Sequence, residues 1–214
     1  MAGCWNPFKP DKDDGGGGGP QELLPRTSPE NVLFNLRVVY GDKDNIVNTN
    51  EDAHTWAEAY RTLFHPDTFT FWFNPGDQPP GQEETWWGLN EEVSSFEMLL
   101  KQKPAGVVDD ITLSWNVSAS EPDSRVGHPT WRHIYVTGIL LDVVVGEIIH
   151  HVPNGTADYY FAPDPTDPRL WVITEWYDHQ PVGSPPSRAI TESIMPTTSA
   201  PEFSSWGRIK ALTR

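Results

Sequence analysis

The hydrophobic positions of this chain follow two different periods, and each change of period marks a boundary between predicted elements. Residues 28–41, 50–65 and 90–103 place apolar side chains three or four positions apart, which predicts three amphipathic helices. Residues 67–73 carry Phe at every second position, which predicts a strand, and a shorter aromatic strand is expected at 85–87. The first half of the chain is therefore predicted as helix, helix, two strands, helix.

Polar residues at the expected starts of the helices support this assignment. Ser28 precedes Pro29, which combines a capping hydroxyl with a proline at the first helical position. The second helix is expected to be capped near Asn50, and Asn90 is the expected capping residue of the third.

The second half of the body has the pattern of a sheet. Four strands are expected, and Asn154-Gly155 predicts a hairpin turn between the second and the third. This order predicts an α+β fold in which a long, curved, mostly antiparallel sheet wraps around about three helices and encloses a cone-shaped space. The four expected strands are residues 111–117, 131–146, 156–161 and 170–177.

The two ends of the chain differ in composition from the body. Residues 1–27 include five consecutive glycines and are expected to form a flexible tether. Residues 181–201 are rich in Pro, Ser and Thr, and apolar residues then return at a constant spacing of three. We therefore expect a domain over residues 28–180, followed at 181–214 by a surface loop and a short docking segment. Those returning apolar residues are Phe203, Trp206, Ile209 and Leu212.

Charge and cysteine content exclude several classes of function. The chain has a net charge of −15, and residues 28–180 contain 24 acidic and 8 basic residues. A domain with this excess of acidic residues repels phosphate groups. We therefore expect no nucleic-acid binding and no attraction to a membrane through charge. The single cysteine excludes a disulfide framework and a Cys-based zinc site. No cofactor is expected.

The element order, together with two sequence segments, resembles the nuclear transport factor 2-like superfamily. The segments are Leu63-Phe64-His65-Pro66-Asp67, which leads into Phe69-Thr70-Phe71, and the closing run from Trp171 to Asp178. The resemblance covers residues 28–180. It implies a cystatin-like fold related to SnoaL-like polyketide cyclases and ketosteroid isomerases, and a homodimer formed through the outer face of the sheet.

The first residues resemble the cleavage site of a bacterial lipoprotein. In Ala2-Gly3-Cys4 small residues precede the cysteine, and a glycine-rich stretch follows. This resemblance implies a lipid on Cys4, a location in the bacterial cell envelope, and contact with the membrane through that anchor alone. The alternative is an incidental thiol on a protein of the cytoplasm.

Two side chains on the expected strands are candidates for acid–base chemistry. Glu175 is a candidate base or hydrogen-bond acceptor, and His133 is a candidate proton donor. The alternative places both on the solvated or dimer-forming face, because a shift of one residue in strand register exchanges the two faces. The residues expected to line a ligand pocket are Tyr135, Tyr177, Trp171, Tyr60 and Trp86.

Other signatures of catalysis are missing from the sequence. Ketosteroid isomerases place a basic Asp just before a Pro, whereas the matching residue here is Asn74, whose amide cannot accept a proton at neutral pH. His150 and His151 are adjacent on a strand and point to opposite faces, so no metal site is expected there. The favoured hypothesis is thus a non-catalytic protein that binds a small apolar or amphipathic ligand, or a protein partner. An acid–base lyase or isomerase that uses the same pocket is the alternative.

Overall fold

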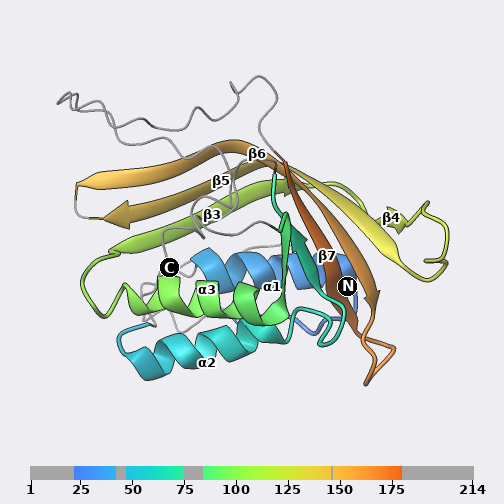
Figure 1. Ribbon diagram of the computed structural model, residues 1–214, viewed down its shortest axis with the longest axis horizontal. Helices are drawn as coiled ribbons and strands as arrows, with labels where there is room; N and C mark the ends of the chain where they lie inside the picture. The colour runs from blue at the N-terminus through green and yellow to red at the C-terminus, as the bar shows by residue number, and fades with distance from the viewer. Residues whose placement is uncertain (1–21, 42–46, 75–83, 146, 180–214) are drawn as a thin grey trace, which may run out of the picture.

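Three helices lie against one face of a curved seven-stranded sheet, as the α+β assignment predicts (Figure 1). The computed structural model describes residues 22–41, 47–74, 84–145 and 147–179. Residues 1–21 of the predicted tether, including Cys4, and the predicted C-terminal region from 181 to 214 lie outside the described residues. Residues 22–27, which were expected to belong to the flexible tether, are described, and Arg26 among them pairs with Asp164 at 2.9 Å. The fold class predicted from sequence is confirmed.

Short polar side chains satisfy the first amide groups of two of the described helices, and the third follows an extended glycine. Helix α1 (Pro29–Gly41) begins after Ser28, whose Oγ accepts a hydrogen bond from the Asn31 amide at 3.2 Å. Helix α2 (Asn50–Arg61) has Thr49 as its cap, in a reciprocal capping box with Asp52. Helix α3 (Leu89–Lys101) follows the extended residue Gly88.

The structure corrects one predicted cap and agrees with another. Asn90 does not cap α3, because the chain already turns helical at Leu89 and the preceding Gly88 makes no side-chain capping bond. The cap of α2, expected near Asn50, is the adjacent Thr49, whose hydroxyl accepts from the Asp52 amide at 3.1 Å.

The sheet is antiparallel except at one pair of strands. Its order is β2-β1-β7-β6-β5-β3, with β4 paired to β5, and β1 runs parallel to β7. Through this parallel pair, the short strands β1 and β2 extend the sheet beyond β7. The strands are β1 (Thr70–Trp72), β2 (Trp86–Gly88), β3 (Asp110–Val117), β4 (Glu121–Pro122), β5 (Arg132–Val145), β6 (Ile148–Pro163) and β7 (Trp171–His179).

An irregularity in the middle of β5 and β6 keeps apolar side chains on the inner face. Ile134 and Val136 are buried at even positions of β5, whereas Ile139 and Leu141 are buried at odd positions. The change of phase falls at a register shift that contains Gly138, whose φ is +59°. The positive φ is the reason for glycine here, because the atom nearest to an added Cβ, the side-chain Nδ2 of Asn116 at 2.9 Å, belongs to a flexible side chain that can move aside.

The predicted hairpin at Asn154-Gly155 is wrong. Strand β6 runs through both residues, and Gly155 pairs with Ile139 across the irregularity. Asn154 has a φ of 53°, so it adopts the left-handed conformation of a hairpin turn within a strand that continues. The chain reverses instead between Val145 and Ile148.

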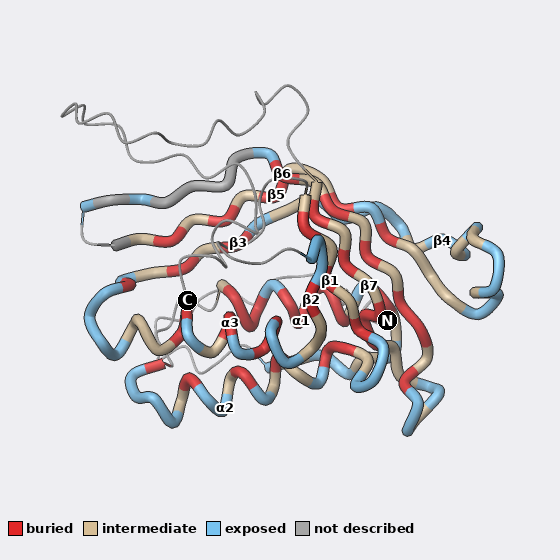
Figure 2. The backbone as a smooth tube through the Cα atoms, in the orientation of Figure 1, coloured by how far each residue is buried: buried red, intermediate tan, exposed pale blue. Residues whose placement is uncertain are grey.

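Aromatic side chains fill the space between the helices and the concave face of the sheet. Figure 2 shows buried positions lining the inner side of the strands and the facing sides of the helices. Tyr60 and Phe96 have ring centroids 4.2 Å apart, and Trp176 lies 5.0 Å from Phe71 and 4.9 Å from Tyr159. Beside Tyr40 lies a cavity of about 10 Å³, roughly the space of one water molecule. The predicted cone exists, and packed side chains occupy its interior.

One carboxyl group is buried within this aromatic core. Glu92, in the first turn of α3, is fully buried. It accepts a hydrogen bond from the hydroxyl of Tyr60 on α2 and another, of 2.9 Å, from the indole nitrogen of Trp87 on β2. Burial, followed by the neighbouring Glu92, raises the pKa of Tyr60 well above its usual range, so the phenol keeps its proton and donates it. Glu92 therefore joins a second helix and an edge strand to α3.

We expect Glu92→Leu to destabilise the fold by about 2–6 kcal/mol. The substitution leaves two buried donors without this acceptor, and each unsatisfied group costs about 1–3 kcal/mol. Urea unfolding monitored by circular dichroism measures the effect. Glu91→Leu, at the exposed neighbouring position, is the control and should leave the free energy of unfolding unchanged. Equal stability of the two variants would contradict the account of the core.

Candidate functional site

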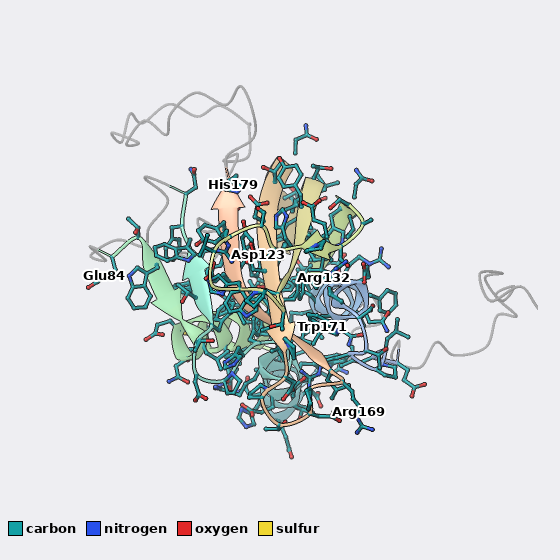
Figure 3. All side chains as sticks on the ribbon, turned by 90° about the vertical axis from the view of Figure 1, so that its right-hand side faces the viewer. Glu84, Asp123, Arg132, Arg169, Trp171 and His179 are labelled. Carbon is teal, nitrogen blue, oxygen red and sulfur yellow. The ribbon has the colours of Figure 1, made fainter. Side chains whose placement is uncertain are left out.

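The outer face of the sheet is partly covered by the connection between β3 and β5. This connection, residues 118–131, is called the strap, and it contains β4. In Figure 3 the strap crosses in front of the sheet at Asp123, while His179 marks the end of β7. The Asp123 amide donates to the carbonyl of Trp131 at 3.0 Å, which closes the loop on itself.

Arg125 adds side-chain contacts between the strap and the sheet to the backbone pairing of β4 with β5. The guanidinium carbon of Arg125 lies 3.5 Å from the ring centroid of Tyr160 on β6. Its Nη1 donates to Glu175 on β7 at 2.6 Å, and its Nε and Nη2 donate to Asp123 within the strap at 2.9–3.1 Å. Glu175 also accepts a hydrogen bond of 3.0 Å from the hydroxyl of Tyr177. The strap is therefore held by ion pairs and by a cation–π contact.

The pKa shifts in this cluster have consistent causes. Partial burial lowers the pKa of Arg125, but hydrogen bonds to Asp123 and Glu175 outweigh it, so the net pKa is raised. Burial and the charge of Glu175 raise the pKa of Tyr177 to about 12. At neutral pH Arg125 is thus a cation held by two carboxyl groups, and Tyr177 is a neutral hydrogen-bond donor.

Two histidines share one carboxylate further along the same face. Asp158 accepts from His133 at 2.5 Å and from His179 at 2.7 Å, and His133 also lies 3.2 Å from Glu121 of the strap. The hydrogen bond to Asp158 raises the pKa of His179. Burial raises the pKa of Asp158. The hydrogen bonds from His179 and His133 together lower it by more, so the pKa of Asp158 is below its usual value. This arrangement favours the charged forms of Asp158 and His179 in mildly acidic solution.

The structure distributes the residues proposed from sequence among several places. Glu175 and His133 lie on the outer face, on either side of Tyr160, because Ile134 and Trp176 are the residues that point inward. Tyr135 and Tyr177 share the outer face, where Tyr135 is 39% exposed and Tyr177 is half-buried. These side chains do not line the cone, so the alternative strand orientation considered from sequence is the observed one.

The other three predicted pocket residues are separated from one another. Tyr60 is fully buried in the core, where it donates to Glu92. Trp171, at the start of β7, packs against the edge of the core, and its amide donates to the carbonyl of Arg26 at 2.7 Å. Trp86 on β2 is 46% exposed and belongs to a groove outside the cone. The five predicted residues therefore do not form one pocket.

This groove has a volume of about 780 Å³ and lies where the C-terminal end of α2, the start of α3 and the turn before β7 meet. Such a volume lies within the range of ligand sites in proteins. This site, called the groove below, is lined by Arg26, Glu58, Arg61, Thr62, Phe64, Pro66, Asp67, Thr68, Phe69, Thr70, Trp86, Gly88, Leu89, Asn90, Glu91, Asp164 and Thr166.

Acidic groups outnumber basic groups in the lining of the groove. Of its two arginines, Arg26 is paired with Asp164 at 2.9 Å, and Arg61 lies 3.3 Å from Glu58. Asp67 and Glu91 are exposed and have no ion-pair partner among the described residues. The groove therefore combines an aromatic side chain, Trp86, with a net negative rim.

Sequence reasoning missed the two residues on which the site and the core most depend. Glu92 is one of two acidic residues in the first turn of α3, and it lies three residues before Ser95 and four before Phe96, on the buried face of that helix. That position within an apolar stripe was an available signal. For Arg125 no local signal existed, because its partner Glu175 lies 50 residues away in the chain.

Comparisons with known proteins find likenesses at the level of structure alone. No family model matches the chain, and no curated protein matches its sequence. Among solved structures, an NTF2-like protein with a cystatin-like fold from Novosphingobium aromaticivorans is 13% identical. The match covers 71% of this chain and 83% of that protein, with a TM-score of 0.41.

Two further structures give similar values. A nuclear transport factor 2-like superfamily protein from Salmonella enterica is 13% identical, over 78% of this chain and all of that protein, with a TM-score of 0.41. ActVI-ORFA from Streptomyces coelicolor is 7% identical, over 69% of this chain and 96% of that protein, also with a TM-score of 0.41. The first two carry the superfamily description that the sequence resemblance implied. These likenesses concern the fold and carry no argument about function.

The described part of the chain contains no helix that is both long enough and apolar enough to span a membrane. No group of three or more His, Cys, Asp or Glu side chains in that part of the chain is arranged to hold a metal ion.

We expect Arg125→Ala to loosen the part of the strap between Asp123 and Trp131, while the pairing of β4 with β5 holds the remainder in place. Hydrogen exchange followed by mass spectrometry should show loss of protection at the amides of Asp123 and Trp131, because the substitution removes both ion pairs and the contact with Tyr160. Arg169→Ala is a matched control, since Arg169 also pairs with the aspartate two residues before it but is 86% exposed. The control should leave strap protection unchanged. An unchanged exchange pattern in the Arg125 variant would show that other contacts hold the strap.

Proposed function

We propose that this chain is a binding protein and that its ligand occupies the groove rather than the cone. The observation that carries the proposal is the contrast between the two spaces. Packed aromatic rings occupy the interior, whereas the groove offers about 780 Å³ that is open to solvent. A ligand can enter the groove without displacing a side chain of the core, so binding there avoids the free-energy cost of opening the core.

The composition of the groove selects an amphipathic ligand. The exposed indole of Trp86, with Phe69 and Leu89 nearby in the lining, offers apolar contact to a flat or aliphatic body. Asn90 and Thr68 add neutral hydrogen-bonding groups. Because carboxylates outnumber guanidinium groups in the lining, a neutral or cationic ligand is favoured over an anionic one.

A second function, an acid–base lyase or isomerase, is favoured by one observation. Glu92 and Tyr60 form a carboxyl–phenol pair in the cone, with the hydroxyl of Tyr40 3.4 Å from that of Tyr60. Groups of this kind perform proton transfer in enzymes. A substrate would have to replace Phe96 or a neighbouring ring to reach them, so binding in the groove is the function that the geometry supports better.

Two matched dyes test the proposed site. N-Phenyl-1-naphthylamine and its sulfonated relative 8-anilino-1-naphthalenesulfonate share one aromatic body and differ in charge. We expect the uncharged dye to bind more tightly at low salt, and Trp86→Ala to weaken it about 3- to 10-fold, the loss of one aromatic contact. Fluorescence titration measures both affinities.

Trp115→Ala is the control for this titration, because Trp115 lines a different and more apolar groove beside α1. It should leave the affinity for the uncharged dye unchanged. The proposal would be contradicted if Trp115→Ala weakened binding of the uncharged dye and Trp86→Ala did not. Tighter binding of the anionic dye than of the uncharged dye would also contradict it.

We further propose that the domain is attached to the bacterial cell envelope through a lipid on Cys4. The support is the sequence Ala2-Gly3-Cys4 and the glycine-rich stretch that follows it. Intact-mass measurement of the protein from its own host should show a diacylglyceryl or triacyl adduct on Cys4. An unmodified thiol in a cytosolic fraction would overturn the proposed location and leave the binding site unaffected.

A further inference from the structure

The rim of the groove carries carboxylates that no described side chain neutralises. Asp67 and Glu91 are exposed, and both lie beside apolar lining residues such as Phe69 and Leu89. An apolar floor with an acidic rim is complementary to a segment that alternates apolar and basic side chains.

The chain contains one such segment near its C-terminal end. Residues 203–214 carry three basic side chains and no acidic one, whereas residues 28–180 carry a large excess of acid. Four apolar side chains recur there at every third position, so they share one face in a 3₁₀-type helix with three residues per turn, with the basic side chains on its other faces. The basic residues are Arg208, Lys210 and Arg214, and the apolar ones are Phe203, Trp206, Ile209 and Leu212.

Charge distinguishes the groove from a second apolar depression on the described surface. That depression, beside α1, is lined by Phe34, Trp115 and Val117 and contains one exposed base, Arg37, and one exposed acid, Glu30. Its lining is therefore neutral and does not attract a basic segment, whereas carboxylates outnumber guanidinium groups in the lining of the groove. The groove is therefore the better match for residues 203–214.

The distance along the chain permits this contact. Residues 180–202 separate the end of β7 from the segment, and a chain of that length spans at most about 80 Å. A domain of about 150 residues has a radius of gyration of about 15 Å, so the segment can reach any part of its surface. Because it is tethered, it acts at an effective concentration on the order of 1 mM. A dissociation constant of about 100 μM for the free segment would suffice for roughly 90% occupancy.

We infer that residues 203–214 occupy the groove of their own chain and compete there with the small ligand. Trp206 and Ile209 contact the apolar lining beside Trp86, and Lys210 and Arg208 lie at the acidic rim formed by Asp67 and Glu91. This inference rests on the proposed binding site, since it identifies a resident competitor for it. Ligand must displace the segment, so the chain itself lowers the apparent affinity of the site.

Zero-length cross-linking of the full chain tests the contact directly. A carbodiimide joins an amine to a carboxylate only when the two touch, and Lys210 is the one lysine of the segment. We expect Lys210 to be joined to Asp67, Glu91 or Glu58. Lys101, which lies 2.7 Å from Glu97, is an internal positive control. Cross-links from Lys210 to carboxylates away from the groove would overturn the inference.

Mixing unlabelled and nitrogen-15-labelled protein identifies which chain supplies the segment. Pairs within one isotope are expected at low concentration. Cross-linked peptide pairs that combine a labelled and an unlabelled peptide in the statistical proportion would show that a second copy supplies the segment. That result would overturn the own-chain assignment.

A full-length variant with Trp206→Ser and Ile209→Ser provides a second readout. It should bind N-phenyl-1-naphthylamine about 10-fold more tightly than the parent, because the competitor no longer holds the groove. Arg188→Ser, in the same region but outside the segment, is the control and should change nothing. Unchanged affinity in the double variant would contradict the inference.

The two tests separate failure of this inference from failure of the proposed function. Dye binding that depends on Trp86, together with an absence of cross-links from Lys210 to the groove, would keep the binding site and reject the resident segment. Cross-links to Asp67 or Glu91 without dye binding in any variant would keep the segment and reject the small-ligand site.

Discussion

The buried carboxyl group of Glu92 is the constraint on which the rest of the structure depends. A polar group inside an aromatic core must have its hydrogen bonds satisfied, and the donors here come from α2 and β2. Meeting this requirement fixes α2 against α3 and places β2 at the edge of the sheet. The same packing brings the C-terminal end of α2 and the start of α3 together around the groove, so the core determines the shape of the outer site.

The two faces of the sheet consequently have different roles. Side chains that point inward, such as Trp176 and Tyr159, complete the core, and burial raises the pKa of Tyr159 well above its usual range. On the outer face, charged groups are paired beneath the strap, where Arg125 contacts Tyr160 and Glu175. The strap covers part of the face through which a homodimer was expected from the sequence resemblance, and any such dimer would have to include the strap in its interface or use the sheet beyond it.

Periodicity was sufficient to predict the helices, the strand-rich second half and the α+β class, because these depend on local spacing. It failed where distant parts of the chain decide the outcome. Asn154-Gly155 has the composition of a hairpin, yet pairing with Ile139 keeps both residues within β6. The face of the sheet occupied by Glu175 depends on register, which the sequence pattern alone could not assign. The groove is formed by residues from four separate segments, and no spacing rule connects Arg61 with Thr166.

The central claim is that the interior of the cone is closed and that binding takes place outside it. The most direct test is a crystal structure of the full chain grown with N-phenyl-1-naphthylamine. The account predicts electron density for the dye against Trp86 in the groove, with Tyr60, Phe96 and Trp176 in the positions described above. Density for the dye between these three rings, with Glu92 released from Tyr60 or Trp87, would contradict it.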